Sequence, residues 1–190
     1  MVANILYPSD LIYVTGVQFH QVVWDPTRAA QGIVFQNENR LVTQNVALIS
    51  HKCVMGTVGF TTGVHYWNLE IIDDAATKYI MIGVSKNASL TTSTYPGANN
   101  DKGVSYYGAN GYRYFANTHA AFGPAFKKGD VVGVLLNMGH KTVTFYLNGQ
   151  RVGTAIGIDQ LTDDIYYPCV ALYTLGHAVV SRELPEGIKP

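Results

Sequence analysis

Apolar and polar residues alternate with a period of two along much of the chain, a pattern typical of β-strands. The segment DVVGVLLNMGHKTVTFYLNG, residues 130–149, shows it most clearly. In its second half, Val143, Phe145 and Leu147 alternate with hydroxyl-bearing or amide residues, which predicts a strand with one buried face. The first half, VVGVLL, is apolar on both faces, so we expect a central strand between two packed layers. The Asn-Gly pair at its end predicts a tight turn.

Similar short runs recur throughout the sequence, whereas helical periodicity is hard to find. Besides the two runs in 130–149, the predicted strands cover residues 17–24, 32–35, 40–43, 46–49, 53–60, 65–72, 78–85, 104–107, 112–115, 151–156, 166–172 and 178–182. Strands of this length and spacing predict an all-β fold, a β-sandwich of two antiparallel sheets.

The longest polar loops are predicted at residues 90–102 and 118–128, and residues 108–111 form the turn of a predicted hairpin. A chain of 190 residues fits one domain. We expect this domain to cover residues 17–183, with an N-terminal extension at 1–16 and a polar C-terminal tail at 184–190. Loops on a rigid scaffold are where binding residues are commonly found.

The composition excludes several function classes. Hydrophobic residues make up 47% of the chain and charged residues 14%, which favours a compact core over disorder. The formal net charge is zero, so we expect no binding to nucleic acid or to an anionic membrane surface. The sequence contains neither a signal-like opening nor an apolar run of membrane-spanning length. We therefore expect no membrane insertion and a cytoplasmic, intracellular location.

Both cysteines, Cys53 and Cys169, lie in apolar strand-like surroundings. We interpret them as buried free thiols, and one disulfide in a secreted protein is the alternative. The tripeptide Asn87-Ala88-Ser89 matches a glycosylation acceptor, but the pattern is short enough to occur by chance.

No set of residues predicts a catalytic, metal or cofactor site. His65 and Cys53 are better explained as a structural histidine and a buried thiol than as a base and a nucleophile. The acidic pairs Asp73-Asp74 and Asp163-Asp164 lack the spacing of a calcium loop. The histidines lack zinc spacing, and residues 103–111 lack the strand and helix that flank a phosphate-binding loop.

Five blocks of the sequence, in order and spacing, resemble a SPRY domain. They are GVHYWNLEI, YIMIGVS, GVSYYGANGYRYF, GDVVGVLLNMGHKTVTFYLNGQRVGTA and YYPCVALY, and the resemblance extends from about residue 24 to residue 182. The stretch VALISHKCVMGTVGFTTGVHYW is most similar to the SPRY domains of SOCS-box and F-box proteins, which present substrates to ubiquitin ligases. The resemblance implies a bent, concanavalin-like or jelly-roll-type sandwich. It also implies that loops at one end bind a short peptide or a partner surface.

The peptide site of that family matches this chain in part. The resemblance assigns a site tyrosine to Tyr95 and an apolar–aromatic pair to Leu172 and Tyr173. A segment that contacts peptide in relatives falls near Thr77 or Thr61. The family's arginine has no counterpart at residues 43–45, which are Thr, Gln and Asn. We therefore expect a site that is more neutral and more aromatic than in relatives.

Tyrosines also gather around the predicted hairpin at 104–115, where alternation places about half of them in the core. Tyrosine suits recognition because it offers a large contact area and a polar tip at low entropic cost. The predicted partner-binding residues are Thr94, Tyr95, Tyr106, Tyr107, Asn110, Leu172, Tyr173 and Thr174.

The sequence thus predicts a non-catalytic protein–protein interaction module, which could act as a ubiquitin-ligase substrate adaptor. One alternative is a structural subunit of a large protein assembly. Another is a lectin-like domain that stacks glycans on tyrosines. An enzyme is the weakest hypothesis, because no acid, base and nucleophile converge.

Overall fold

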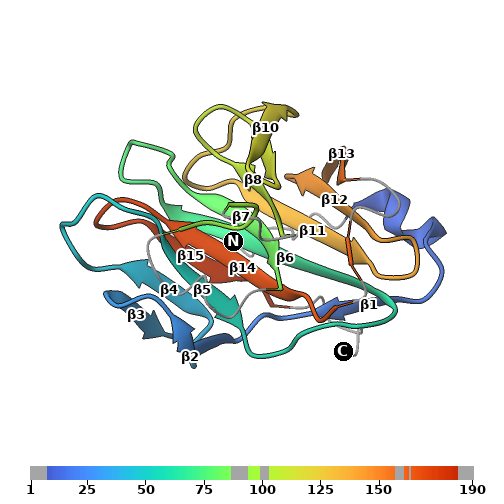
Figure 1. The fold of residues 1–190 in the computed structure, drawn as a ribbon, viewed down its shortest axis with the longest axis horizontal. Helices are drawn as coiled ribbons and strands as arrows, with labels where there is room; N and C mark the ends of the chain where they lie inside the picture. The colour runs from blue at the N-terminus through green and yellow to red at the C-terminus, as the bar shows by residue number, and fades with distance from the viewer. Residues whose placement is uncertain (1–7, 87–93, 99–102, 157–160, 163, 184–190) are drawn as a thin grey trace, which may run out of the picture.

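The protein folds into two β-sheets packed face to face (Figure 1). The computed structural model describes residues 8–86, 94–98, 103–156, 161–162 and 164–183. Within these ranges the one helix is a short 3-10 turn, η1 (Ser9–Tyr13). The predicted all-β sandwich is confirmed.

The first sheet, sheet A, has eight strands in the order β13-β12-β11-β6-β15-β4-β3, and β1 pairs with β6. The β1–β6 pair is parallel, and the other pairs of sheet A are antiparallel. The strands are β1 (Val17–His20), β3 (Ile33–Gln36), β4 (Leu41–Gln44), β6 (Val64–Asp73), β11 (Val131–Asn137), β12 (Thr142–Leu147), β13 (Gln150–Ile156) and β15 (Ala178–Ser181).

The second sheet, sheet B, has seven antiparallel strands in the order β10-β9-β8-β7-β14-β5-β2. They are β2 (Trp24–Ala29), β5 (Lys52–Gly56), β7 (Met81–Ser85), β8 (Val104–Tyr107), β9 (Tyr112–Phe115), β10 (Thr118–Ala121) and β14 (Tyr167–Leu172).

Strand β11 is a central strand, as its sequence predicts. Val132, Val134 and Leu136 point into the core between the sheets, where they join apolar residues of sheet B. Leu135 points to the opposite face of sheet A and packs in a second apolar cluster. A strand apolar on both faces is therefore covered on both sides.

The helix η1 covers this opposite face of sheet A. Leu11 is buried against Tyr66, Leu135 and Tyr146, and the Tyr146 hydroxyl donates a hydrogen bond to the Asp10 carboxylate at 3.2 Å. The helix η1, which belongs to the expected N-terminal extension, is therefore packed on the sandwich.

Three local predictions were wrong. Residues 46–49 do not form a strand. They lie in a loop in which Leu48 and Ile49 are 64% and 69% exposed. Part of the predicted loop 118–128 forms the edge strand β10. The predicted strand 17–24 is two strands, because the chain leaves sheet A after β1 and enters sheet B at β2.

The cysteine interpretation is confirmed, since Cys53 and Cys169 are both buried and unbridged. The glycosylation tripeptide lies outside the described residues. In the part of the chain that the structure describes, no helix has the length and apolar character needed to cross a membrane.

A substitution of Gly133 in β11 tests the packing on the face of sheet A that η1 covers. A methyl group at this position would overlap the hydroxyl of Tyr66, which is buried and hydrogen-bonded to Asn68 at 2.6 Å. Gly133→Ala should therefore lower the free energy of unfolding by roughly 1–3 kcal/mol. Urea denaturation measures this change. The control is Gly139→Ala, whose new methyl group would meet only an ordinary contact with Asn137 at 3.4 Å. Equal stabilities of the two variants would contradict this account of the packing.

Candidate functional site

Six aromatic side chains pack together on the outer face of sheet B and on the loops at one end of its strands. We refer to them as the aromatic cluster: His51, Tyr79, Tyr95, Tyr107, Tyr114 and Tyr173. His51, Tyr79 and Tyr173 flank β5, β7 and β14, whereas Tyr107 and Tyr114 lie in β8 and β9, and Tyr95 lies between β7 and β8. Only the pairing of β5, β7, β8, β9 and β14 in one sheet brings them together.

Strand alternation decides which residues reach this face. In β14, Val170 and Leu172 point into the core, and Cys169 and Ala171 point outward. Tyr173 follows Leu172 and continues the outward row. The same rule applies in β8, since successive side chains of a strand alternate between the two faces.

His51 is the centre of the cluster. Its ring centroid lies 5.0 Å from that of Tyr95 and 4.8 Å from that of Tyr173. The rings of Tyr79 and Tyr173 meet edge to face at 5.4 Å, as do those of Tyr107 and Tyr114 at 5.7 Å. These separations are typical of favourable aromatic pairs. The rings therefore hold one another in place.

Small and sulfur-containing side chains lie beneath these rings. This layer consists of Cys53, Met55, Met81, Cys169 and Ala171, all of them buried. The Cys53 thiol donates a hydrogen bond to the carbonyl oxygen of Thr94 at 2.9 Å. That contact ties the segment carrying Tyr95 to the sheet. Methionine adapts its shape readily, so the layer can accommodate small shifts of the rings above it.

His177 fixes the neighbouring loops. The backbone N–H groups of Tyr173 and Thr174 both point at its Nδ1, at 3.1 and 3.2 Å. Its Nδ1 must therefore accept, and its Nε2 donates to the Thr77 hydroxyl at 2.8 Å. Burial lowers the pKa of His177, which favours this neutral form. The loops before β7 and after β14 are thereby joined.

Exposed apolar residues surround this end of the cluster. The loops before β5, between β6 and β7, and between β14 and β15 meet at the left of Figure 1. They carry Leu48, Ile49, Tyr79 and Leu175, each at least 40% exposed. Hydrogen bonds between Gln44, the last residue of β4, and residues 176–177 hold the β14–β15 loop beside the start of the loop before β5. Contiguous exposed apolar side chains are more common at contact sites than elsewhere on a protein surface.

The cluster is uncharged. Burial, and secondarily the nearby His177, lower the pKa of His51 to about 4. Burial, and then the neighbouring tyrosines, raise the pKa of Tyr107 to about 12. Both groups are therefore neutral at physiological pH. A ligand would meet aromatic faces and hydroxyl groups rather than a formal charge.

The structure brings together only some of the predicted site residues. Tyr95, Tyr107 and Tyr173 lie in the cluster, and Thr174 lies beside it, with its hydroxyl 3.3 Å from that of Thr77. Asn110 is exposed in the β8–β9 turn and accepts a hydrogen bond from the N–H of Tyr112.

The other three predicted residues do not present a surface. Tyr106 and Leu172 are fully buried in the core, because alternation turns them inward. Thr94 is only 8% exposed. Neither Tyr106 nor Leu172 can contact a partner directly.

Sequence reasoning missed His51, Tyr79 and Tyr114 as site residues. Tyr79 and Tyr114 belong to the predicted strands 78–85 and 112–115, and alternation relative to Ile80 and Phe115 would have placed them outward. His51 precedes a strand and has no local pattern that marks it. Of the two threonines that the resemblance left open, Thr77 lies at this site through its bonds to Thr174 and His177.

The residues considered for catalysis are separated. Cys53 belongs to β5 of sheet B, whereas His65 belongs to β6 of sheet A and bonds to His20 and Thr62. In the described ranges, no three His, Cys, Asp or Glu side chains are grouped as metal ligands would be.

The comparisons with known proteins identify the family. The family model described as the SPRY domain matches residues 64–185. This chain belongs to the SPRY domain family. The match includes β6 to β15, and therefore the strands that carry most of the aromatic cluster.

Curated relatives contain a similar segment. The E3 ubiquitin-protein ligase TRIM9 of Drosophila melanogaster is 27% identical over 178 residues, which is 86% of this chain. Ran-binding protein 9 of Danio rerio is 30% identical over 118 residues, or 62% of this chain. The SPRY chain spans only 22% and 19% of these two relatives.

Solved SPRY domains share the fold. The SPRY domain of human HERC1 superimposes with a TM-score of 0.71 at 22% identity, covering 85% of this chain and 98% of that domain. The TRIM65 PSpry domain gives a TM-score of 0.69 at 14% identity, covering 88% and 92%.

The lowered pKa of His51 predicts a pH-dependent stability. Between pH 6.5 and about 4 the unfolded chain binds a proton at this histidine that the folded protein does not. The free energy of unfolding should therefore fall as the pH falls through this range, by at most about 1.4 kcal/mol per pH unit for this proton. Urea denaturation from pH 7 to pH 4.5 measures the slope, which should be shallower in His51→Phe. An NMR titration of His51 with a midpoint near pH 6.5 would show that the imidazole is not shielded.

Proposed function

We propose that this SPRY domain is a non-catalytic protein-interaction module that binds a partner segment on the aromatic cluster. The observation that supports it most is the cluster itself. Six rings lie on the outer face of a sheet and are bordered by exposed Leu48, Ile49 and Leu175. SPRY domains are a family of protein-interaction modules.

The chemistry of the cluster favours an uncharged partner segment. Aromatic and apolar side chains would fill the spaces between the rings, and backbone groups would bond to tyrosine hydroxyls. An acidic segment would find no cation among the six cluster residues. The partner's specificity then comes from shape and from hydrogen bonds.

Within this proposal, the domain acts as a substrate-recognition unit of a ubiquitin ligase in the cytoplasm. The name of the TRIM9 relative supports the ligase role. The two unbridged cysteines agree with a reducing compartment.

Substitution of cluster tyrosines tests the binding site. Tyr95→Ala and Tyr173→Ala should each reduce recovery of the partner at least about tenfold, because truncated aromatic anchors cost 2 kcal/mol or more at interfaces. Affinity purification with quantitative mass spectrometry measures recovery, and thermal denaturation monitors the fold.

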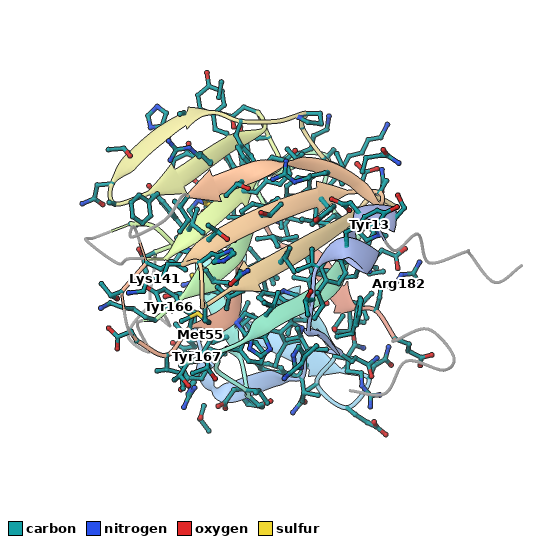
Figure 2. All side chains as sticks on the ribbon, turned by 90° about the vertical axis from the view of Figure 1, so that its right-hand side faces the viewer. Tyr13, Met55, Lys141, Tyr166, Tyr167 and Arg182 are labelled. Carbon is teal, nitrogen blue, oxygen red and sulfur yellow. The ribbon has the colours of Figure 1, made fainter. Side chains whose placement is uncertain are left out.

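The matched control is Tyr13→Ala. Tyr13 is 83% exposed and lies on η1, far from Met55 and Tyr167 of sheet B in Figure 2. Its removal should leave partner recovery unchanged. Unfolding of both cluster variants, or unchanged recovery by both, would count against the proposed site.

The identity of the recovered proteins tests the adaptor role separately. Ubiquitin-ligase subunits together with varied substrates would support it. Recovery of one abundant assembly at fixed stoichiometry would instead support the structural-subunit alternative, with the same surface serving as a permanent contact.

A further inference from the structure

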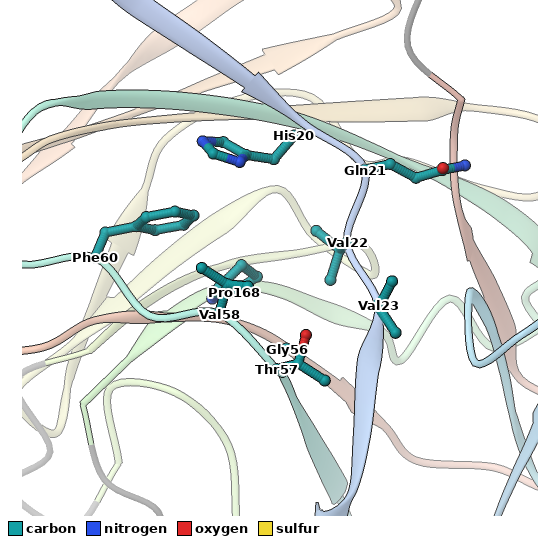
Figure 3. A pocket seen from close by; sticks show the side chains of 9 residues that line it. All are labelled: His20, Gln21, Val22, Val23, Gly56, Thr57, Val58, Phe60 and Pro168. Carbon is teal, nitrogen blue, oxygen red and sulfur yellow. The ribbon is translucent and has the colours of Figure 1, made fainter. Parts of the chain in front are cut away.

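A second, smaller site lies at the other end of the strands that carry the aromatic cluster. His51 and Tyr173 lie at one end of β5 and β14, whereas Gly56 and Pro168 lie at the opposite end of the same two strands. There the structure encloses a pocket of about 80 Å³ (Figure 3). It is lined by His20, Gln21, Val22, Val23, Gly56, Thr57, Val58, Phe60 and Pro168.

The walls of this pocket are mainly apolar. Val22, Val58, Phe60 and Pro168 surround it, and the ring of His20 lies against that of Phe60, with centroids 4.7 Å apart. Pockets for cofactors and drug-sized ligands measure about 300–1,000 Å³. This pocket is large enough for a single side chain only.

A chain of hydrogen bonds fixes the protons of the histidine in this pocket. The Nε2 of His65 lies 2.6 Å from the carbonyl oxygen of Thr62. A carbonyl can only accept, so Nε2 of His65 carries the proton and its Nδ1 has a free lone pair. The Nε2 of His20 lies 2.9 Å from that Nδ1 and must therefore donate to it.

This relay leaves Nδ1 of His20 as a hydrogen-bond acceptor. Burial, and then the neighbouring His65, lower the pKa of His20 to about 4, so the ring is neutral at physiological pH. The one ring hydrogen bond of His20 to the described residues uses Nε2, so Nδ1 has no partner there. Nδ1 is also not fully buried, and His20 lines the pocket, so a ligand can reach this atom. The pocket thus combines apolar walls with one fixed acceptor.

We propose that this pocket binds one branched apolar side chain of a partner protein, whose own backbone N–H donates a hydrogen bond to Nδ1 of His20. The volume of the pocket admits a single side chain, and its walls favour an apolar one. The acceptor Nδ1 of His20 requires a hydrogen-bond donor beside that side chain. This site is separate from the aromatic cluster and does not depend on the function proposed for it.

The smallest probe with these features is N-acetyl-leucine N-methylamide. Titrating it into the ¹⁵N-labelled protein should shift the His20 imidazole and Val22 signals saturably, with a Kd on the order of millimolar. The analogue methylated on the leucine nitrogen lacks the donor and should bind about five- to tenfold more weakly. N-acetyl-glycine N-methylamide lacks the side chain and should cause no saturable shift.

Two variants remove the two features independently. In Gly56→Ala the new methyl group would lie 3.3 Å from both Val22 and Pro168, which narrows the pocket and should abolish the shifts. His20→Phe keeps a ring but loses the acceptor, so it should bind the leucine probe and its methylated analogue equally.

Tyr173→Ala alters the distant cluster and should leave the probe's affinity unchanged, so failure of one site is distinguishable from failure of the other. No saturable shift in the wild-type protein at about 50 mM probe would overturn the proposal. Equal binding of the leucine probe and its methylated analogue to the wild-type protein would also overturn it.

Discussion

The face-to-face packing of two sheets is the constraint on which the rest of this structure depends. Trp67 and Phe145 from sheet A meet Ile82, Tyr106 and Leu172 from sheet B, all of them buried. Because strand side chains alternate, each inward residue fixes the direction of its neighbours. The core therefore decides that Tyr107 and Tyr173 point outward, and a one-residue slip in β8 or β14 would bury them and expose the core.

The same alternation of side chains also gives sheet B an apolar outer face. On this outer face, buried cysteine, methionine and alanine side chains lie directly against the sheet, and the aromatic cluster covers them. On sheet A the corresponding face is covered by η1 instead. One apolar face is thus covered by the chain itself, whereas on the other face the cluster includes the exposed Tyr79 and is bordered by the exposed Leu48 and Leu175. This asymmetry is why the proposed interaction surface lies on sheet B.

Local pattern predicted the strands and the core well, because alternation is a property of neighbouring residues. It predicted the site less well. Tyr106 and Tyr107 are adjacent residues of the same type. Their directions follow from the pairing of β8 with β7, in which the core residue Ile82 lies opposite Tyr106 and Met81 lies opposite Tyr107. The apolar run at 46–49 resembles a strand in sequence, yet these residues lie in a loop in which Leu48 and Ile49 are exposed, and no local pattern predicts this. His51 became part of the site through contacts at long sequence distance, which no local pattern encodes.

The central claim is that the partner contacts the outer face of sheet B at the aromatic cluster. Site-specific photocrosslinking tests it most directly, with benzoylphenylalanine placed at the partly exposed position of Tyr79 and, in a second protein, at that of Tyr13. We predict a covalent adduct with the partner from position 79 and none from position 13. An adduct from position 13 alone would contradict the account.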